Sequence, residues 1–86
     1  MKLEGRIYCS NLMLREYTAI RPDSGERFVT QLEKCLVDLC HSLEIPIPLW
    51  LKKNTHEFAR FHQTLFFAEQ FGEPIAFERF QIHWLE

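Results

Sequence analysis

A helical apolar repeat in the middle of the chain most constrains the fold. Asp23, followed three residues later by Glu26, has the form of a capping box and predicts that a helix starts there. Ile45-Pro46-Ile47-Pro48 predicts its end, because prolines remove backbone donors and push the preceding residues towards extended geometry. We expect an amphipathic helix of about five turns, whose apolar side must pack on another element. The apolar residues at steps of three and four are Phe28, Leu32, Cys35, Leu36, Leu39 and Leu43.

The N-terminal segment has the period of a strand instead. Polar and apolar residues alternate from Lys2 to Cys9, and Ser10-Asn11 can form a two-residue turn. A hairpin with this turn places Ile7 opposite Leu14 and Arg6 opposite Arg15. The two opposed arginines would need a nearby acid.

A second helix and a last strand complete the predicted elements. Asn54 and Glu57 repeat the arrangement of a cap and an acid three residues later, so we expect a helix from near Thr55. It should end within residues 63–67, where consecutive aromatics and a threonine weaken the helical pattern. The last strand is predicted from the alternation of Phe80, Ile82 and Trp84 with Arg79, Gln81 and His83.

The predicted fold class follows from this order of elements. Residues 1–86 are expected to form a single α+β domain with the order β-β-α-α-β, because a chain of 86 residues supports one core. Each element has one apolar side, so a three-stranded antiparallel sheet should carry both helices on one face. We expect the last strand to pair beside the first.

Composition and charge limit the classes of partner. A net charge of -2 gives no long-range attraction for nucleic acid, so a dedicated nucleic-acid binder is disfavoured. The N-terminus lacks the apolar run of a signal peptide, and no stretch approaches the ~20 apolar residues of a membrane span. We therefore expect a cytoplasmic protein that does not enter a membrane. Its three cysteines are expected to be reduced and mostly buried.

The residues that carry chemistry show no motif. His56 and His62 are six residues apart, unlike the four-residue spacing of a zinc helix, so their spacing gives little support for a shared metal. Cys35 and Cys40 are five apart and cannot clamp one ion as a Cys-x-x-Cys pair would. The glycines are isolated, which excludes phosphate loops and dinucleotide fingerprints. We expect no catalytic residue, no cofactor and no metal, and hence a protein that is not an enzyme. The alternative is a site of His41, His56 or His62 with nearby acids, which requires a cleft that brings them together.

A small basic stripe is the one local charge feature. Next to a helix start, such a stripe could bind a phosphate-bearing ligand, a nucleic acid or an acidic side chain of a partner. The favoured interpretation is a solvated face paired with Glu57 and other acids. Both interpretations concern the same four residues, which are Lys52, Lys53, His56 and Arg60.

Aromatic residues are more numerous than so small a core needs. They gather in the C-terminal half, and aromatic enrichment also marks protein interfaces. We expect an interaction module that binds a protein partner or a second copy of itself, through this surface or through an uncovered edge strand near the C-terminus. The candidate interface residues are Trp50, Phe67, Phe71 and Trp84.

Several short stretches resemble a known group of proteins. They are Ile47-Pro48-Leu49-Trp50-Leu51, Asn54, Glu57-Phe58, Phe71 and Phe77-Glu78-Arg79-Phe80-Gln81-Ile82. Together with the opening Lys2-Leu3-Glu4-Gly5-Arg6, this pattern is similar to a family of short uncharacterised proteins of Gram-positive bacteria. The resemblance implies a bacterial cytosolic origin, and it implies no functional residues because that family carries no assigned activity.

Overall fold

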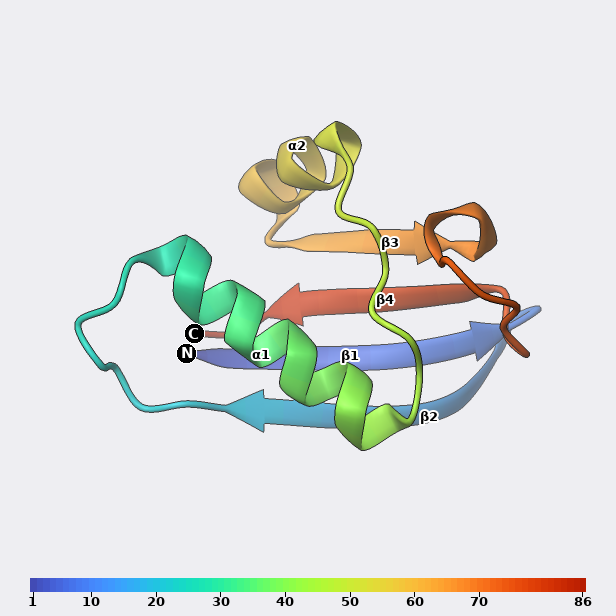
Figure 1. Cartoon of the computed structure of the whole chain (residues 1–86), viewed down its shortest axis with the longest axis horizontal. Helices are drawn as coiled ribbons and strands as arrows, with labels where there is room; N and C mark the ends of the chain where they lie inside the picture. Colours follow the sequence, from blue (N-terminus) through green and yellow to red (C-terminus); the bar gives the residue numbers. More distant parts are fainter.

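A computed structural model describes residues 1–86 as a two-layer arrangement of a sheet and two helices (Figure 1). The sheet is antiparallel and has four strands in the order β2-β1-β4-β3. The elements in chain order are β1 (Lys2–Cys9), β2 (Leu12–Ile20), α1 (Phe28–Leu43), α2 (Lys52–Phe61), β3 (Gln63–Phe67), the short 3-10 helix η1 (Ala68–Gln70) and β4 (Arg79–Trp84). The predicted α+β class, with two helices and an antiparallel sheet, is confirmed. Neither helix is long and apolar enough to cross a membrane.

The prediction of three strands was wrong, because residues 63–67 form β3. His62 adopts a left-handed conformation with φ of 59°, and this ends α2 after Phe61. Thr64 and Phe66 are then both buried while their neighbours are not, which is the alternation of a strand. The last strand does pair beside the first, as predicted. The added strand, however, makes the element order β-β-α-α-β-β and changes the strand order of the sheet.

The start of α1 also differs from the prediction. Asp23 and Glu26 do not cap the helix, which begins at Phe28. The Asp23 carboxylate accepts a hydrogen bond from the Gly25 backbone N–H at 3.0 Å. The Glu26 carboxylate accepts one from Ser24 and forms an ion pair with Lys34 on α1. These acids therefore shape the loop before the helix.

The predicted register of the hairpin was wrong, because β2 contains a β-bulge at Leu14. The turn lies at residues 10–11 as predicted, but beyond Met13 the pairing shifts by one residue. Arg6 consequently lies opposite Glu16 instead of Arg15, and its Nε donates to the Glu16 carboxylate at 3.1 Å. The extra residue thus replaces two opposed arginines with an ion pair.

The core lies between the helices and one face of the sheet, here called the covered face. Gly5 of β1 lies on this face directly beneath Leu39 of α1. A Cβ atom at Gly5 would be 3.0 Å from a Phe80 ring carbon and 3.1 Å from a Leu39 methyl carbon. The missing side chain therefore lets α1 lie directly on β1. The buried apolar residues are Leu3, Ile7, Ala19, Leu32, Cys35, Leu36, Leu39, Cys40, Leu43, Phe58, Phe66, Phe71, Phe80 and Ile82.

Replacing Gly5→Ala is expected to lower the free energy of unfolding by about 1–3 kcal/mol, because the added methyl overpacks this contact. Urea denaturation followed by circular dichroism measures the change. Gly72→Ala is the matched control, since a Cβ there meets nothing within 4 Å. If Gly5→Ala were as stable as Gly72→Ala, the close packing of α1 on β1 would be refuted.

Candidate functional site

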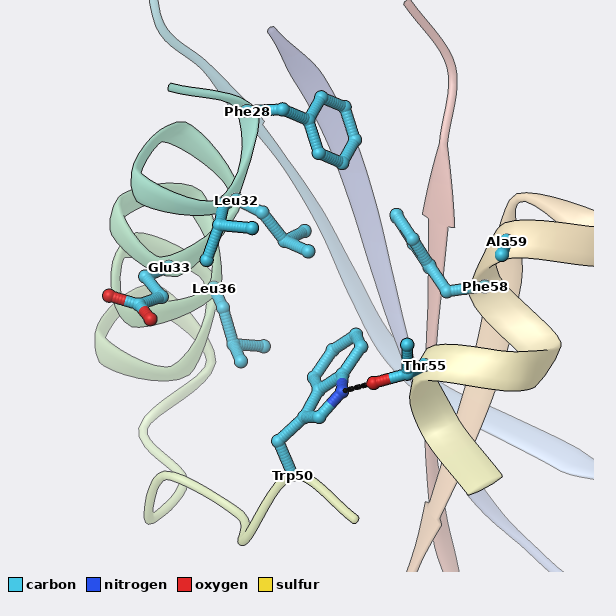
Figure 2. Close-up of a pocket in the computed structure, with 9 residues that line it drawn as sticks. Phe28, Leu32, Glu33, Leu36, Trp50, Thr55, Phe58 and Ala59 are labelled. Carbon is cyan, nitrogen blue, oxygen red and sulfur yellow. Dashed lines mark hydrogen bonds between the residues drawn. The ribbon is translucent and has the colours of Figure 1, made fainter. Parts of the chain in front are cut away.

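An apolar groove of about 480 Å³ lies between α1 and α2 (Figure 2). Seven of its nine lining residues are hydrophobic. Trp50, from the connector between the helices, closes one end, and the Glu33 carboxylate points away from the hollow. The lining residues are Phe28, Val29, Leu32, Glu33, Leu36, Trp50, Thr55, Phe58 and Ala59.

Helix α1 forms one wall of the groove. Its apolar face is wider than the part that packs on the sheet, so some of its apolar side chains line the groove instead. Leu39 and Cys35 point to the core and are fully buried. Phe28 and Leu36 lie on the adjoining side of the helix at a spacing that aligns them over two turns. Phe28 and Val29 remain 42% and 56% exposed. The chain therefore leaves apolar side chains in contact with water at the mouth of the groove.

Aromatic contacts join the groove to the core. The Trp50 ring lies 5.9 Å from Phe58 and 5.7 Å from Phe66, measured between ring centroids. The Trp50 indole Nε1 donates to the Thr55 hydroxyl at 2.8 Å (Figure 2), which fixes the indole across the end of the groove. At the other end, Phe28 meets the edge of Trp84 at 4.9 Å. The floor is consequently a packed and rigid aromatic surface.

A buried amide pair holds the α2 wall in place. Asn54 is completely buried in the first turn of α2 and does not start the helix as predicted, because α2 begins at Lys52. Its Oδ1 accepts from the Leu51 backbone N–H and from Gln70 Nε2, both at 2.9 Å. Its Nδ2 donates to the Thr64 hydroxyl at 2.8 Å and to the Leu65 carbonyl at 3.0 Å. Every hydrogen-bonding position of this amide is satisfied.

Gln70 is the second member of the pair and is 2% exposed. Its Nε2 donates to the Leu49 carbonyl at 3.1 Å as well as to Asn54, and its Oε1 accepts from the Phe67 N–H at 3.1 Å. The Leu49 N–H in turn donates to the Gln70 carbonyl at 2.7 Å. The pair therefore joins α2, β3, η1 and the connector that carries Trp50.

Replacing Asn54→Ala is expected to lower the free energy of unfolding by about 3 kcal/mol, because it leaves several buried donors and acceptors without partners. Urea denaturation measures the loss. Asn11→Ala, at an exposed turn position, is the matched control and should change stability by less than about 0.5 kcal/mol. Equal losses in the two variants would contradict the role given to Asn54.

The four predicted interface residues do not form one surface. Trp50 lines the groove, and Trp84 packs between Phe28 and His62 with its indole N–H buried and without an acceptor. Phe71 is buried against Phe77 and belongs to the core. Phe67 is 37% exposed at the end of β3. Only Trp50 and Trp84 are therefore associated with the groove.

The four predicted basic residues are all exposed on α2. None of the five ion pairs in the structure includes them, and Glu57 accepts a hydrogen bond from Thr64 instead. Lys53 Nζ lies 4.8 Å from the centre of the Phe67 ring, and the Arg60 guanidinium lies 5.5 Å from that of Phe61. The predicted pairing with Glu57 is absent, so the positive charge of this side of α2 is not neutralised within the chain.

The histidines and cysteines are dispersed. No hydrogen bond joins His41, His56 or His62 to a carboxylate, and no group of three or more His, Cys, Asp or Glu residues is placed to hold a metal ion. The cysteines form no disulfide. Burial in the core raises the pKa of the Cys40 thiol to about 12 and also raises the pKa of Cys35. These two thiols are packing residues that stay protonated at neutral pH.

Stability is expected to fall as the pH rises above about 8.5, where the unfolded Cys40 thiol ionises while the folded thiol keeps its proton. The contribution is fully present below that pH and declines by up to about 1.4 kcal/mol per pH unit until the folded pKa is reached. Urea denaturation of the protein and of Cys40→Ala between about pH 8 and pH 11 isolates the effect. Parallel stability curves for the two proteins would contradict it.

Most groove residues were not identified from the sequence as a site. In the sequence, Phe28, Leu32 and Leu36 belong to the predicted apolar side of the first helix, and only Trp50 belongs to the predicted interface. The available signal was Val29, an additional apolar residue on α1 beside the predicted apolar side. Comparisons with protein-family models, with curated proteins and with solved structures find no match to this chain. The resemblance to a bacterial family thus stays a prediction.

Proposed function

We propose that this chain is a non-enzymatic protein-binding module, and that its groove binds an amphipathic helix of a partner protein that carries Asp or Glu along one flank. The observation that carries the proposal is an apolar groove with an unneutralised basic rim on one side. Helix-in-groove recognition requires such a surface, because apolar anchors at i, i+3, i+4 and i+7 must leave water on binding.

The shape and lining of the groove favour an apolar occupant. Its volume of about 480 Å³ lies in the range of roughly 300–1,000 Å³ found for binding pockets. The only hydrogen-bonding side chains at its floor, Trp50 and Thr55, bond to each other. The Trp50 N–H is therefore already paired and needs no acceptor from an occupant, and the exposed parts of Phe28 and Val29 supply apolar area to cover.

The charges beside the groove favour an acidic flank. Lys52 and His56 precede the groove residues Thr55 and Ala59 by three positions each, so they are neighbours on the surface of α2. On the α1 side the nearest charge is Glu33. A bound helix with carboxylates on one flank only would place them beside α2, which fixes its orientation and speeds association.

Selection from a display library of helical peptides tests the proposal. Peptides retained by the protein are expected to share apolar anchors at helical spacing and Asp or Glu on one flank. Their affinity, measured by fluorescence anisotropy, should fall at least tenfold in Ala59→Arg, which fills the groove, and several-fold in Lys52→Glu. Retained peptides without acids, or equal binding by Ala59→Arg and the unchanged protein, would overturn the proposal.

Ala76→Arg is the matched control, because Ala76 is exposed and lies outside the groove. It should bind the selected peptides as the unchanged protein does, and circular dichroism should show that both arginine variants are folded. The alternative function, binding of a phosphate-bearing ligand or nucleic acid through the basic residues, predicts a different pattern. A labelled single-stranded RNA would then bind in a salt-sensitive way, with loss in Lys52→Ala and Arg60→Ala and no loss in Ala59→Arg.

A further inference from the structure

The two edge strands of the sheet, β3 and β2, differ in whether side chains form hydrogen bonds with their outward-facing backbone groups. At the β3 edge, the backbone carbonyl of His62 accepts a hydrogen bond from the backbone N–H of Trp84 on β4. Because successive residues of a strand point their backbone groups in alternate directions, those of Leu65 and Phe67 face outward from the sheet. The Leu65 carbonyl accepts from Asn54 Nδ2, and the Phe67 N–H donates to Gln70 Oε1. Side chains thus occupy outward-facing groups of this edge, and α2 packs over β3.

At the β2 edge, α1 packs over the face of the strand, but the outward-facing backbone groups have no side-chain partners (Figure 1). Met1 and Arg21 exchange backbone hydrogen bonds, so the same alternation turns the N–H and C=O groups of Glu16, Thr18 and Ile20 away from β1. No side chain bonds to these groups. The strand also lacks the lysine and proline that commonly protect an edge.

We propose that β2 pairs with β2 of a second copy of this chain, antiparallel about a two-fold axis at Tyr17, to form a dimer with a continuous eight-stranded sheet. Because this surface lies on the opposite edge of the sheet from α2, the proposal is independent of the groove. A second copy is a fitting occupant because an antiparallel edge is complementary to itself under a two-fold axis.

Repulsion between like charges argues against two of the neighbouring registers. An axis at Arg15 or at Glu16 would place like charges directly opposite each other, which is destabilising. An axis at Tyr17 places Glu16 opposite Thr18 of the other copy and the two Tyr17 side chains opposite each other. The hydrogen-bonded pairs are then the outward-facing Glu16 and Thr18, as the backbone alternation requires.

Apolar side chains around the axis supply the buried area. Tyr17 is 47% exposed and Ile20 68% exposed. On the covered face, a hollow of about 320 Å³ lies beside the edge and is lined in part by Tyr17, Ala19 and Val37. The second tyrosine would pack against this apolar surface as the strands join.

The assembly closes at two copies. The bulge at Leu14 interrupts regular pairing, so the paired segment about Tyr17 is confined to residues 15–19. Each β2 edge is used once, and on the β3 edges that remain the Leu65 carbonyl and the Phe67 N–H are already bonded to Asn54 and Gln70. Strand addition therefore cannot continue into a fibre.

Thr18→Pro tests the pairing, because it removes an outward-facing donor and no hydrogen bond to β1. Sedimentation equilibrium at sub-millimolar concentration should give twice the chain mass of 10.4 kDa for the unchanged protein and the single mass for Thr18→Pro. Thr18→Val, which keeps the donor, is the control and should remain dimeric. A single mass for the unchanged protein, or a dimeric Thr18→Pro that is folded by circular dichroism, would overturn the proposal.

Disulfide crosslinking tests the register in a Cys9→Ser background. Tyr17→Cys should crosslink fully on oxidation, because directly opposed residues of a non-hydrogen-bonded pair have Cα atoms about 4.5 Å apart, within disulfide range. Arg15→Cys should stay uncrosslinked. Faster crosslinking by Thr18→Cys or Arg15→Cys than by Tyr17→Cys would reject the stated dimer. Ala59→Arg should remain dimeric, which separates this result from the outcome of the groove experiments.

Discussion

The hydrogen bond between the side chains of Asn54 and Gln70, 2.9 Å long and completely enclosed, is the interaction on which the upper half of the molecule depends. The two amides are 16 residues apart and reach the start of α2, the end of the connector, the outer side of β3 and the turn η1. Buried amides are costly when unpaired, so a structure that satisfies all their bonds is strongly preferred over near alternatives. This requirement sets the position of α2 and hence the width of the groove.

The same pair divides the surface of the protein into two kinds of region. On the β3 side the pair forms hydrogen bonds with backbone groups that could otherwise bond to another strand. On the groove side it positions α2 without using the basic residues, which remain in solvent. The β2 side receives none of this protection. The groove, which would contact the side chains of a partner, therefore lies apart from the β2 edge, whose backbone groups could pair with another strand.

The sequence predicts elements whose periodicity is long, and it fails where distant residues decide. The alternation in Lys2–Cys9 and Arg79–Trp84 predicts β1 and β4, and the apolar repeat predicts α1. In contrast, β3 has five residues and only Thr64 and Phe66 point inward, so its local pattern resembles the end of a helix. The bulge at Leu14 depends on Arg6 finding Glu16 across the hairpin. The groove depends on the distance between two helices, which no single segment encodes.

The two tryptophans at the ends of the groove differ in environment. Trp50 is hydrogen-bonded to Thr55 and half-buried beside the hollow, whereas the Trp84 indole N–H is enclosed without an acceptor. Since indole emission depends on the polarity around the ring, the two tryptophans are expected to contribute differently to the intrinsic fluorescence of the protein. The emission of Trp50 would report directly on the filling of the hollow, while that of Trp84 would report on the integrity of the aromatic floor.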